Sequence, residues 1–146
     1  MDRICCFYAN EEHLASILLP YIDEKIKENY SIVAMFEKNI GKSFEKIGKI
    51  FQTNKETLIK IDSIFMDKPK NDKTDIAIIF GTDKYIEKKL KFTKEINTVI
   101  ICYGILEDIG KIKKIIETNN KVLLTSGLVQ ISEYFKLEKR ETYSKV

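Results

Sequence analysis

The chain has 146 residues, of which 44% are hydrophobic and 32% are charged, and its formal net charge is +3 at pH 7. This length fits one domain that buries its own core, and the composition is typical of a soluble globular protein. The small net charge gives no indication of a nucleic acid or a membrane as a direct partner, and we expect neither. The N-terminus lacks the layout of a signal peptide and no apolar run is long enough to span a membrane, so we expect a cytoplasmic protein.

Five short and almost uninterrupted apolar runs predict buried β-strands. They are rich in Ile and Val and lack polar alternation, which is typical of strands covered on both faces. A segment with helical spacing follows each run, and this order predicts a parallel sheet with helices on both sides. The expected fold is α/β: a single-domain three-layer sandwich with a mostly parallel sheet of five to six strands, of the RecA or Rossmann type. The runs are residues 3–8, 31–36, 75–81, 98–104 and 121–127.

The first helical segment follows the first strand directly. Asn10 is a good N-cap, and the acidic pair after it suits the positive end of a helix. Leu14 opens a broad apolar face that continues in phase beyond Pro20, so we expect the proline to kink the helix and not to end it. Asn29 tolerates the left-handed conformation that closes a helix.

The middle of the chain alternates between helical and extended patterns. A second helix is expected over residues 40–54. Weak alternation over residues 58–66 predicts an extra strand at an edge of the sheet, and residues 67–75 predict a mobile polar loop.

The last third of the chain predicts three more helices and a tail. One helix starts at Thr82 and Asp83, the next runs through Ile109 and Ile116, and a weaker one covers residues 131–139. We expect a single domain over residues 1–140, followed by a frayed C-terminal tail at 141–146.

The three cysteines, Cys5, Cys6 and Cys102, all lie within apolar runs. Neighbouring residues of a strand point to opposite faces, so Cys5 and Cys6 cannot bind one metal ion together. The chain has a single histidine, His13, which makes a Cys/His metal site hard to assemble. We therefore expect buried, reduced cysteines and no metal or cofactor.

The tripeptide Gly41-Lys42-Ser43 matches the end of the phosphate-binding P-loop. A complete P-loop carries a second glycine five residues before the first of these, and that position is Phe36. Glu37 lies in the segment between, where its carboxylate would face the phosphates. The sequence therefore predicts an ordinary loop leading into a helix.

Both ends of the chain resemble the MEDS-type sensory domains, which are named from methanogens and methylotrophs. The opening RICCFYANEEHLASILLPYI, followed by SIVAMF, is similar to that family's strand, acidic turn, proline-containing helix and second strand. NTVIICYGILED followed by KVLLTSGLVQISEYF is similar to its later part, with Cys102-Tyr103, Gly127 and an aromatic pair at Tyr134-Phe135.

This resemblance implies a degenerate relative of the RecA/KaiC-like nucleotide-hydrolase fold. In that comparison the P-loop would lie between Tyr8 and Leu14, where this chain has no glycine, no lysine and two carboxylates. The chain departs from the family pattern at Arg3, where histidine is usual, at Glu28-Asn29, where glycine is common, and over residues 58–75, which match poorly.

Ligands of doubly wound sheets bind beyond the carboxyl ends of the strands. We therefore expect ligand-binding residues there and no catalytic set. His13, near the positive end of a helix, is better explained as a partly exposed surface group, and rim tyrosines and strand-end glycines each have a structural explanation as well. The candidate residues are Tyr8, Asn10, Glu37, Thr82, Asp83, Tyr103 and Gly127.

Three functions are compatible with these features. The first is a non-enzymatic sensory or regulatory module that binds a small ligand or a signalling protein. The second is an adaptor or inhibitor acting by protein–protein contact alone, for which an open sheet edge makes a homodimer a candidate assembly. The third is a small enzyme that uses a strand-end carboxylate, Glu37 or Asp83. Fold alone does not decide among them.

Overall fold

The computed structural model describes residues 1–70, 73–104 and 109–135. Strands and helices alternate along most of the chain, as the apolar runs predict, and residues 131–135 are also helical. The elements are β1 (Asp2–Tyr8), α1 (Glu11–Lys27), β2 (Ile32–Phe36), α2 (Gly41–Ile50), α3 (Lys55–Ile64), β3 (Ile76–Phe80), α4 (Asp83–Leu90), β4 (Thr98–Gly104), α5 (Ile109–Thr118), β5 (Lys121–Leu124) and β6 (Gly127–Gln130).

The strands form one six-stranded sheet in the order β2-β3-β4-β1-β5-β6. The first five strands are parallel and β6 is antiparallel to β5. β1 lies between β4 and β5, with Cys6 directly opposite Cys102. The predicted α/β class with a mostly parallel sheet is confirmed.

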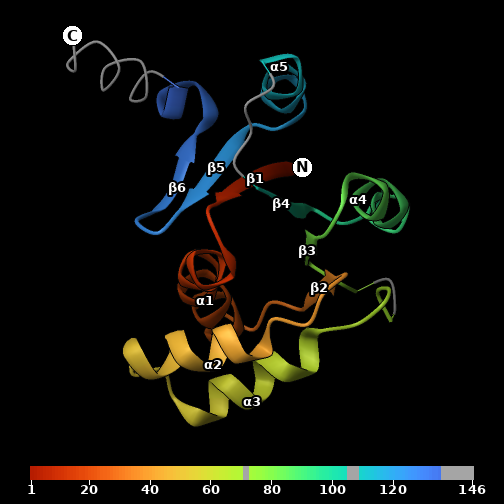
Figure 1. The fold of residues 1–146 in the computed structure, drawn as a ribbon. Helices are drawn as coiled ribbons and strands as arrows, with labels where there is room; N and C mark the ends of the chain where they lie inside the picture. Colours follow the sequence, from red (N-terminus) through yellow and green to blue (C-terminus); the bar gives the residue numbers. More distant parts are fainter. Residues whose placement is uncertain (71–72, 105–108, 136–146) are drawn as a thin grey trace, which may run out of the picture.

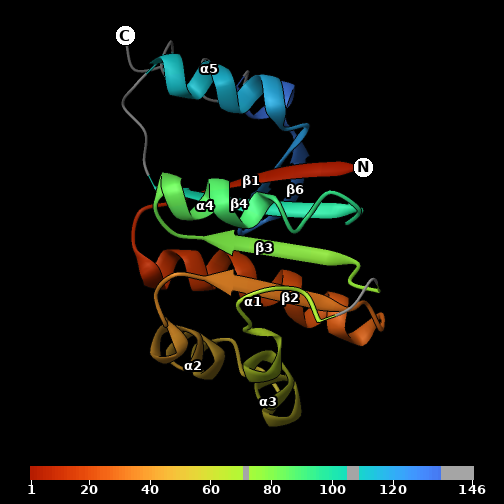
Figure 2. The same cartoon turned by 90° about the vertical axis from the view of Figure 1, so that its right-hand side faces the viewer.

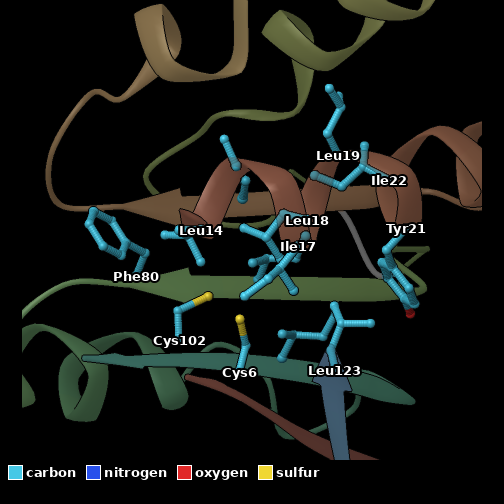
Figure 3. Close-up of a cluster of buried hydrophobic side chains, with 14 of the residues drawn as sticks. Cys6, Leu14, Ile17, Leu18, Leu19, Tyr21, Ile22, Phe80, Cys102 and Leu123 are labelled. Carbon is cyan, nitrogen blue, oxygen red and sulfur yellow. The ribbon is translucent and has the colours of Figure 1, made fainter. Parts of the chain in front are cut away.

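Helices cover both faces of the sheet (Figure 1). α1, α2 and α3 lie on one face, and α4 and α5 lie on the other. The larger part of the core lies under α1, whose side chains Leu14, Leu18 and Ile22 are fully buried. Figure 3 shows Cys6 and Cys102 side by side beneath this helix. Three layers with two apolar interfaces explain why the strands carry almost no polar residues.

The cysteines lie as predicted. Cys6 and Cys102 belong to the core under α1, whereas Cys5 belongs to the core on the opposite face. All three are free and buried. Burial, together with the neighbouring Cys6, raises the pKa of Cys102 well above its usual range, so this thiol stays protonated.

The boundaries of α1 confirm the predicted capping. The Asn10 side chain accepts a hydrogen bond from the His13 amide at 2.8 Å. The helix continues past Pro20 to Lys27, and Asn29 follows it in the left-handed conformation with φ 66°.

The predicted edge strand at residues 58–66 is wrong, because this segment is α3. The Asn54 side chain caps the helix by accepting from the Glu56 amide at 2.8 Å. Thr57, Ile61 and Ile64 form the buried face, with the spacing of four and three residues that a helix requires. Of the predicted strand, only Phe65 is paired with a strand, through an isolated bridge to Ala34 of β2. The helix before it, α2, ends at Ile50, earlier than predicted.

The predicted fifth strand, residues 121–127, is also wrong in extent. β5 ends at Leu124, and the chain turns back to form β6 from Gly127, whose φ of 122° suits glycine. Part of the predicted last helix, 136–139, lies outside the described residues. So do the predicted tail at 141–146 and residues 71–72 of the predicted loop.

Across the part of the chain that the structure describes, none of the helices is both long enough and apolar enough to cross a membrane.

Candidate functional site

The sheet has a topological switch point between β1 and β4. The chain leaves β1 toward α1 on one face, whereas β4 is followed in sequence by α5 on the other face, so Tyr8 and Gly104 flank the position where doubly wound sheets bind ligands. The Tyr8 ring packs against Phe80 with centroids 5.5 Å apart. A methyl group added at Gly104 would lie 3.8 Å from the Tyr8 hydroxyl. Tyr8 therefore lies over the switch point, and burial raises its pKa.

In the turn after β1, two backbone amides donate hydrogen bonds to side chains of the same turn. The Ala9 amide donates to Nδ1 of His13 at 2.8 Å, and the His13 amide donates to Asn10 at 2.8 Å. Glu11 and Glu12 form ion pairs with Lys38 and Lys46 at 2.5 and 2.8 Å. His13 is a hydrogen-bond acceptor that fixes this turn, a function that its position in the sequence does not reveal.

Glu37 and Thr82 meet where β2 and β3 end. Oε1 of Glu37 accepts from the Thr82 amide at 2.9 Å, and the Glu37 amide donates to the carbonyl of Phe80 at 2.9 Å. Thr82 in turn caps α4 by accepting from the Tyr85 amide at 3.3 Å. The two predicted residues are brought together, in contacts that join β2 to the start of α4.

Asp83 and Tyr103 lie in a cleft of about 560 Å³ between α4 and α5. Figure 2 shows α4 in front of β4 and α5 on the same side of the sheet, beyond β1. Ile101 of β4 lies at the cleft, with Ile86 of α4 and Ile115 of α5 on either side. The volume falls in the range of small-molecule sites, and the interior is apolar, as such sites usually are.

Charged groups line the cleft around this apolar interior. Lys111 of α5 and Asp83 of α4 form an ion pair at 2.6 Å that links the two helices. Arg3, Lys114 and Glu87 line the same cleft. Charged residues surrounding apolar side chains are the arrangement that orients a ligand.

Asn119 supplies the polar group of greatest interest in the cleft. It is 6% exposed, and its Nδ2 donates to the carbonyl of Ile115 at 3.0 Å and to Oγ1 of Thr118 at 3.2 Å. Its Oδ1 has no hydrogen-bond partner among the described residues. The bond to the Ile115 carbonyl fixes which way the amide is turned. A buried acceptor left unpaired costs about 1–3 kcal/mol.

Tyr103 lies beside Asn119 in the cleft. Burial raises the pKa of its hydroxyl to about 12, and the Asn119 side chain opposes part of that rise. The sequence predicts Asp83 and Tyr103 as site residues, but it does not predict the cleft residues Asn119, Arg3 and Lys114. An asparagine after a helix is common as a turn residue, so the sequence carries no signal that would have singled it out.

The other predicted residues lie elsewhere. Tyr8 and Asn10 stay at the end of β1, on the side of the sheet that α1 covers. Gly127 is not at the end of a parallel strand, because it begins β6. It lines a separate hollow of about 350 Å³ together with Pro20 and Tyr21. The predicted set therefore does not form one site.

Gly41-Lys42-Ser43 form the first turn of α2. The Gly41 amide donates to the side chain of Asn39 at 2.8 Å, so this amide is not directed at a ligand. Within residues 1–70, 73–104 and 109–135, no group of three or more His, Cys, Asp or Glu side chains is arranged to hold a metal ion.

The expectation of a MEDS-type domain depends on short motifs. Tyr8 and Cys102, two of the residues that carry it, belong to the core under α1, where apolar packing alone explains them. The resemblance therefore stays a prediction. Compared with protein-family models, with curated proteins and with solved structures, the chain gives no match.

Proposed function

We propose that this chain is a non-enzymatic sensory or regulatory module that binds a small ligand between α4 and α5. The observation that carries the proposal is the cleft of about 560 Å³, whose interior is apolar and whose lining holds charged side chains and the buried Asn119. A concave site of this volume with an apolar interior and a few polar groups is typical of small-molecule binding sites.

The turn after β1 supports binding without nucleotide hydrolysis. Its amides at Ala9 and His13 donate to side chains of the same turn, and Glu11 and Glu12 add negative charge where phosphates would lie. A phosphate site needs free backbone amides at this place. The carboxylates considered for an enzyme are also engaged, since Glu37 accepts from Thr82 and Asp83 pairs with Lys111.

A thermal-shift screen against a library of small metabolites tests the proposal. We expect at least one compound to raise the melting temperature of the native protein, because a ligand that binds only the folded state stabilises it. The stabilisation should be lost in Glu87→Trp, which places an indole at the wall of the cleft. Lys88→Trp, at an exposed position next to it and outside the cleft lining, should retain it.

Three results would contradict the proposal. The first is that no compound stabilises the protein, and the second is that Glu87→Trp responds like Lys88→Trp. The third is magnesium-dependent turnover of ATP or GTP by the purified protein that disappears in Lys42→Ala, since Lys42 is the lysine of the partial P-loop motif.

The sheet edge favours a second candidate function, an adaptor that acts by protein–protein contact. β6 lies at the end of the sheet, and Leu128 on it is 43% exposed. Exposed edge strands can pair with a strand of another chain. Recovery of one stoichiometric partner that is lost in Leu128→Lys, with no metabolite changing the melting temperature, would favour this function over ligand binding.

A further inference from the structure

We infer that the ligand of the α4–α5 cleft is a small organic acid with an apolar body. This inference rests on the proposed function and names the class of ligand for the same site. Two features of the cleft carry it: the apolar interior and an excess of positive charge.

The apolar body follows from the side chains between the helices. Ile86 and Leu90 come from α4, Ile101 from β4 and Ile115 from α5. Three of the four are nearly inaccessible to solvent, at 6%, 5% and 3% exposure for Ile86, Ile101 and Ile115, so they form a fixed wall. A ring or branched aliphatic group lying against them would be transferred out of water, which is favourable in proportion to its area.

The acid group follows from the balance of charge. Arg3, Lys111 and Lys114 line the cleft against Asp83 and Glu87. Asp83 is paired with Lys111, which leaves two cations facing one carboxylate. In the part of the chain that the structure describes, no carboxylate lies within ion-pair distance of Arg3 or Lys114. An anionic group on the ligand would form ion pairs with these two cations. A guanidinium binds carboxylates with well-defined geometry.

Indole-3-acetate carries both features and is the probe for calorimetry. We expect it to bind the native protein, and we expect its methyl ester, which keeps the ring and removes the charge, to bind at least about tenfold more weakly.

Variants of the cations test the charge from the side of the protein. Lys114→Gln and Arg3→Gln should each weaken binding of indole-3-acetate by about tenfold and leave the affinity for its methyl ester unchanged. Lys113→Gln is the matched control, because Lys113 is an exposed lysine of the same helix that does not line the cleft. The chemical shifts of the Asn119 side-chain amide, measured by nuclear magnetic resonance, should change when the acid binds.

The outcomes separate this inference from the proposed function. The ligand class is overturned if indole-3-acetate fails to bind at millimolar concentration. It is also overturned if the acid and its ester bind equally, or if Lys114→Gln and Lys113→Gln behave alike. A different class of compound that stabilises the native protein and not Glu87→Trp would leave the proposed function standing. Absence of any cleft-dependent ligand in the metabolite screen would remove both.

Discussion

Gly81, at the end of β3, shows how closely single residues are packed at the carboxyl edge of the sheet. A methyl group at this position would lie 2.6 Å from Cδ1 of Tyr85 and 2.9 Å from Cβ of Glu37. Both neighbours are held in place, because Glu37 accepts from the Thr82 amide and Tyr85 belongs to the first turn of α4. The sequence placed Glu37 and Thr82 at this edge correctly. It could not show that they bond to each other, since that depends on the pairing of β2 with β3.

We expect Gly81→Ala to lower the free energy of unfolding by about 1–3 kcal/mol, because a contact below 3 Å forces the neighbouring side chains or the backbone to move. Urea unfolding followed by circular dichroism measures it. Gly104→Ala is the control, since its added methyl group would meet Tyr8 at 3.8 Å, an ordinary contact distance. Equal stability of native protein and Gly81→Ala would show that the edge is looser than the structure indicates.

At the scale of elements, the sequence predicts most helices and strands and fails where a polar residue replaces an apolar one. The sequence of α3 predicts a strand because Ile59 and Ile61 alternate with polar residues. Ile59 is in fact 69% exposed, and the buried face uses Thr57, which hides the helical spacing from a hydrophobicity pattern. β6 was missed for a different reason. Its four residues follow a short turn, and their alternating burial is too brief to separate from the run before it.

The cap of α3 provides a test at this scale. Asn54→Ala removes the acceptor for the Glu56 amide, and we expect it to destabilise the protein by about 1 kcal/mol. Asn54→Asp keeps an acceptor at the same place and should stay within about 0.5 kcal/mol of the native protein. Thermal and urea unfolding of the three proteins compares them. If alanine and aspartate are equally destabilising, the cap does not contribute to α3 as the structure indicates.

For the whole molecule, the class of fold follows from the order of strands and helices, but the order of strands within the sheet does not. The five parallel strands are all short apolar runs, and any of them could occupy the centre as far as composition is concerned. The cleft depends on that order, because it forms where α4 and α5 flank β4 and β1. Asp83 and Tyr103 could be predicted from their positions after strands. Asn119, Arg3 and Lys114 become neighbours of those residues only in the folded chain.

Buried tyrosines on both sides of the sheet predict how the whole molecule responds to alkali. Burial raises the pKa of Tyr21, on the buried face of α1, and of Tyr103, in the cleft, to about 12 each. In the unfolded chain a tyrosine loses its proton near pH 10, so the folded state holds these protons longer. The stability that they contribute is therefore complete below about pH 10 and is lost as the pH rises from 10 to 12.

Phenylalanine variants isolate this effect from the titration of lysines. We expect Tyr21→Phe to differ from the native protein by a constant amount up to pH 9 and to gain on the order of 1 kcal/mol relative to it by pH 11, because phenylalanine has no proton to lose. Tyr103→Phe should change in the same direction and by less, since its ring is half-buried and the Asn119 side chain opposes the rise in its pKa. Urea midpoints at pH 8, 9, 10 and 11 give the comparison. A native–variant difference that is flat across this range would mean that water reaches both hydroxyls in the folded protein.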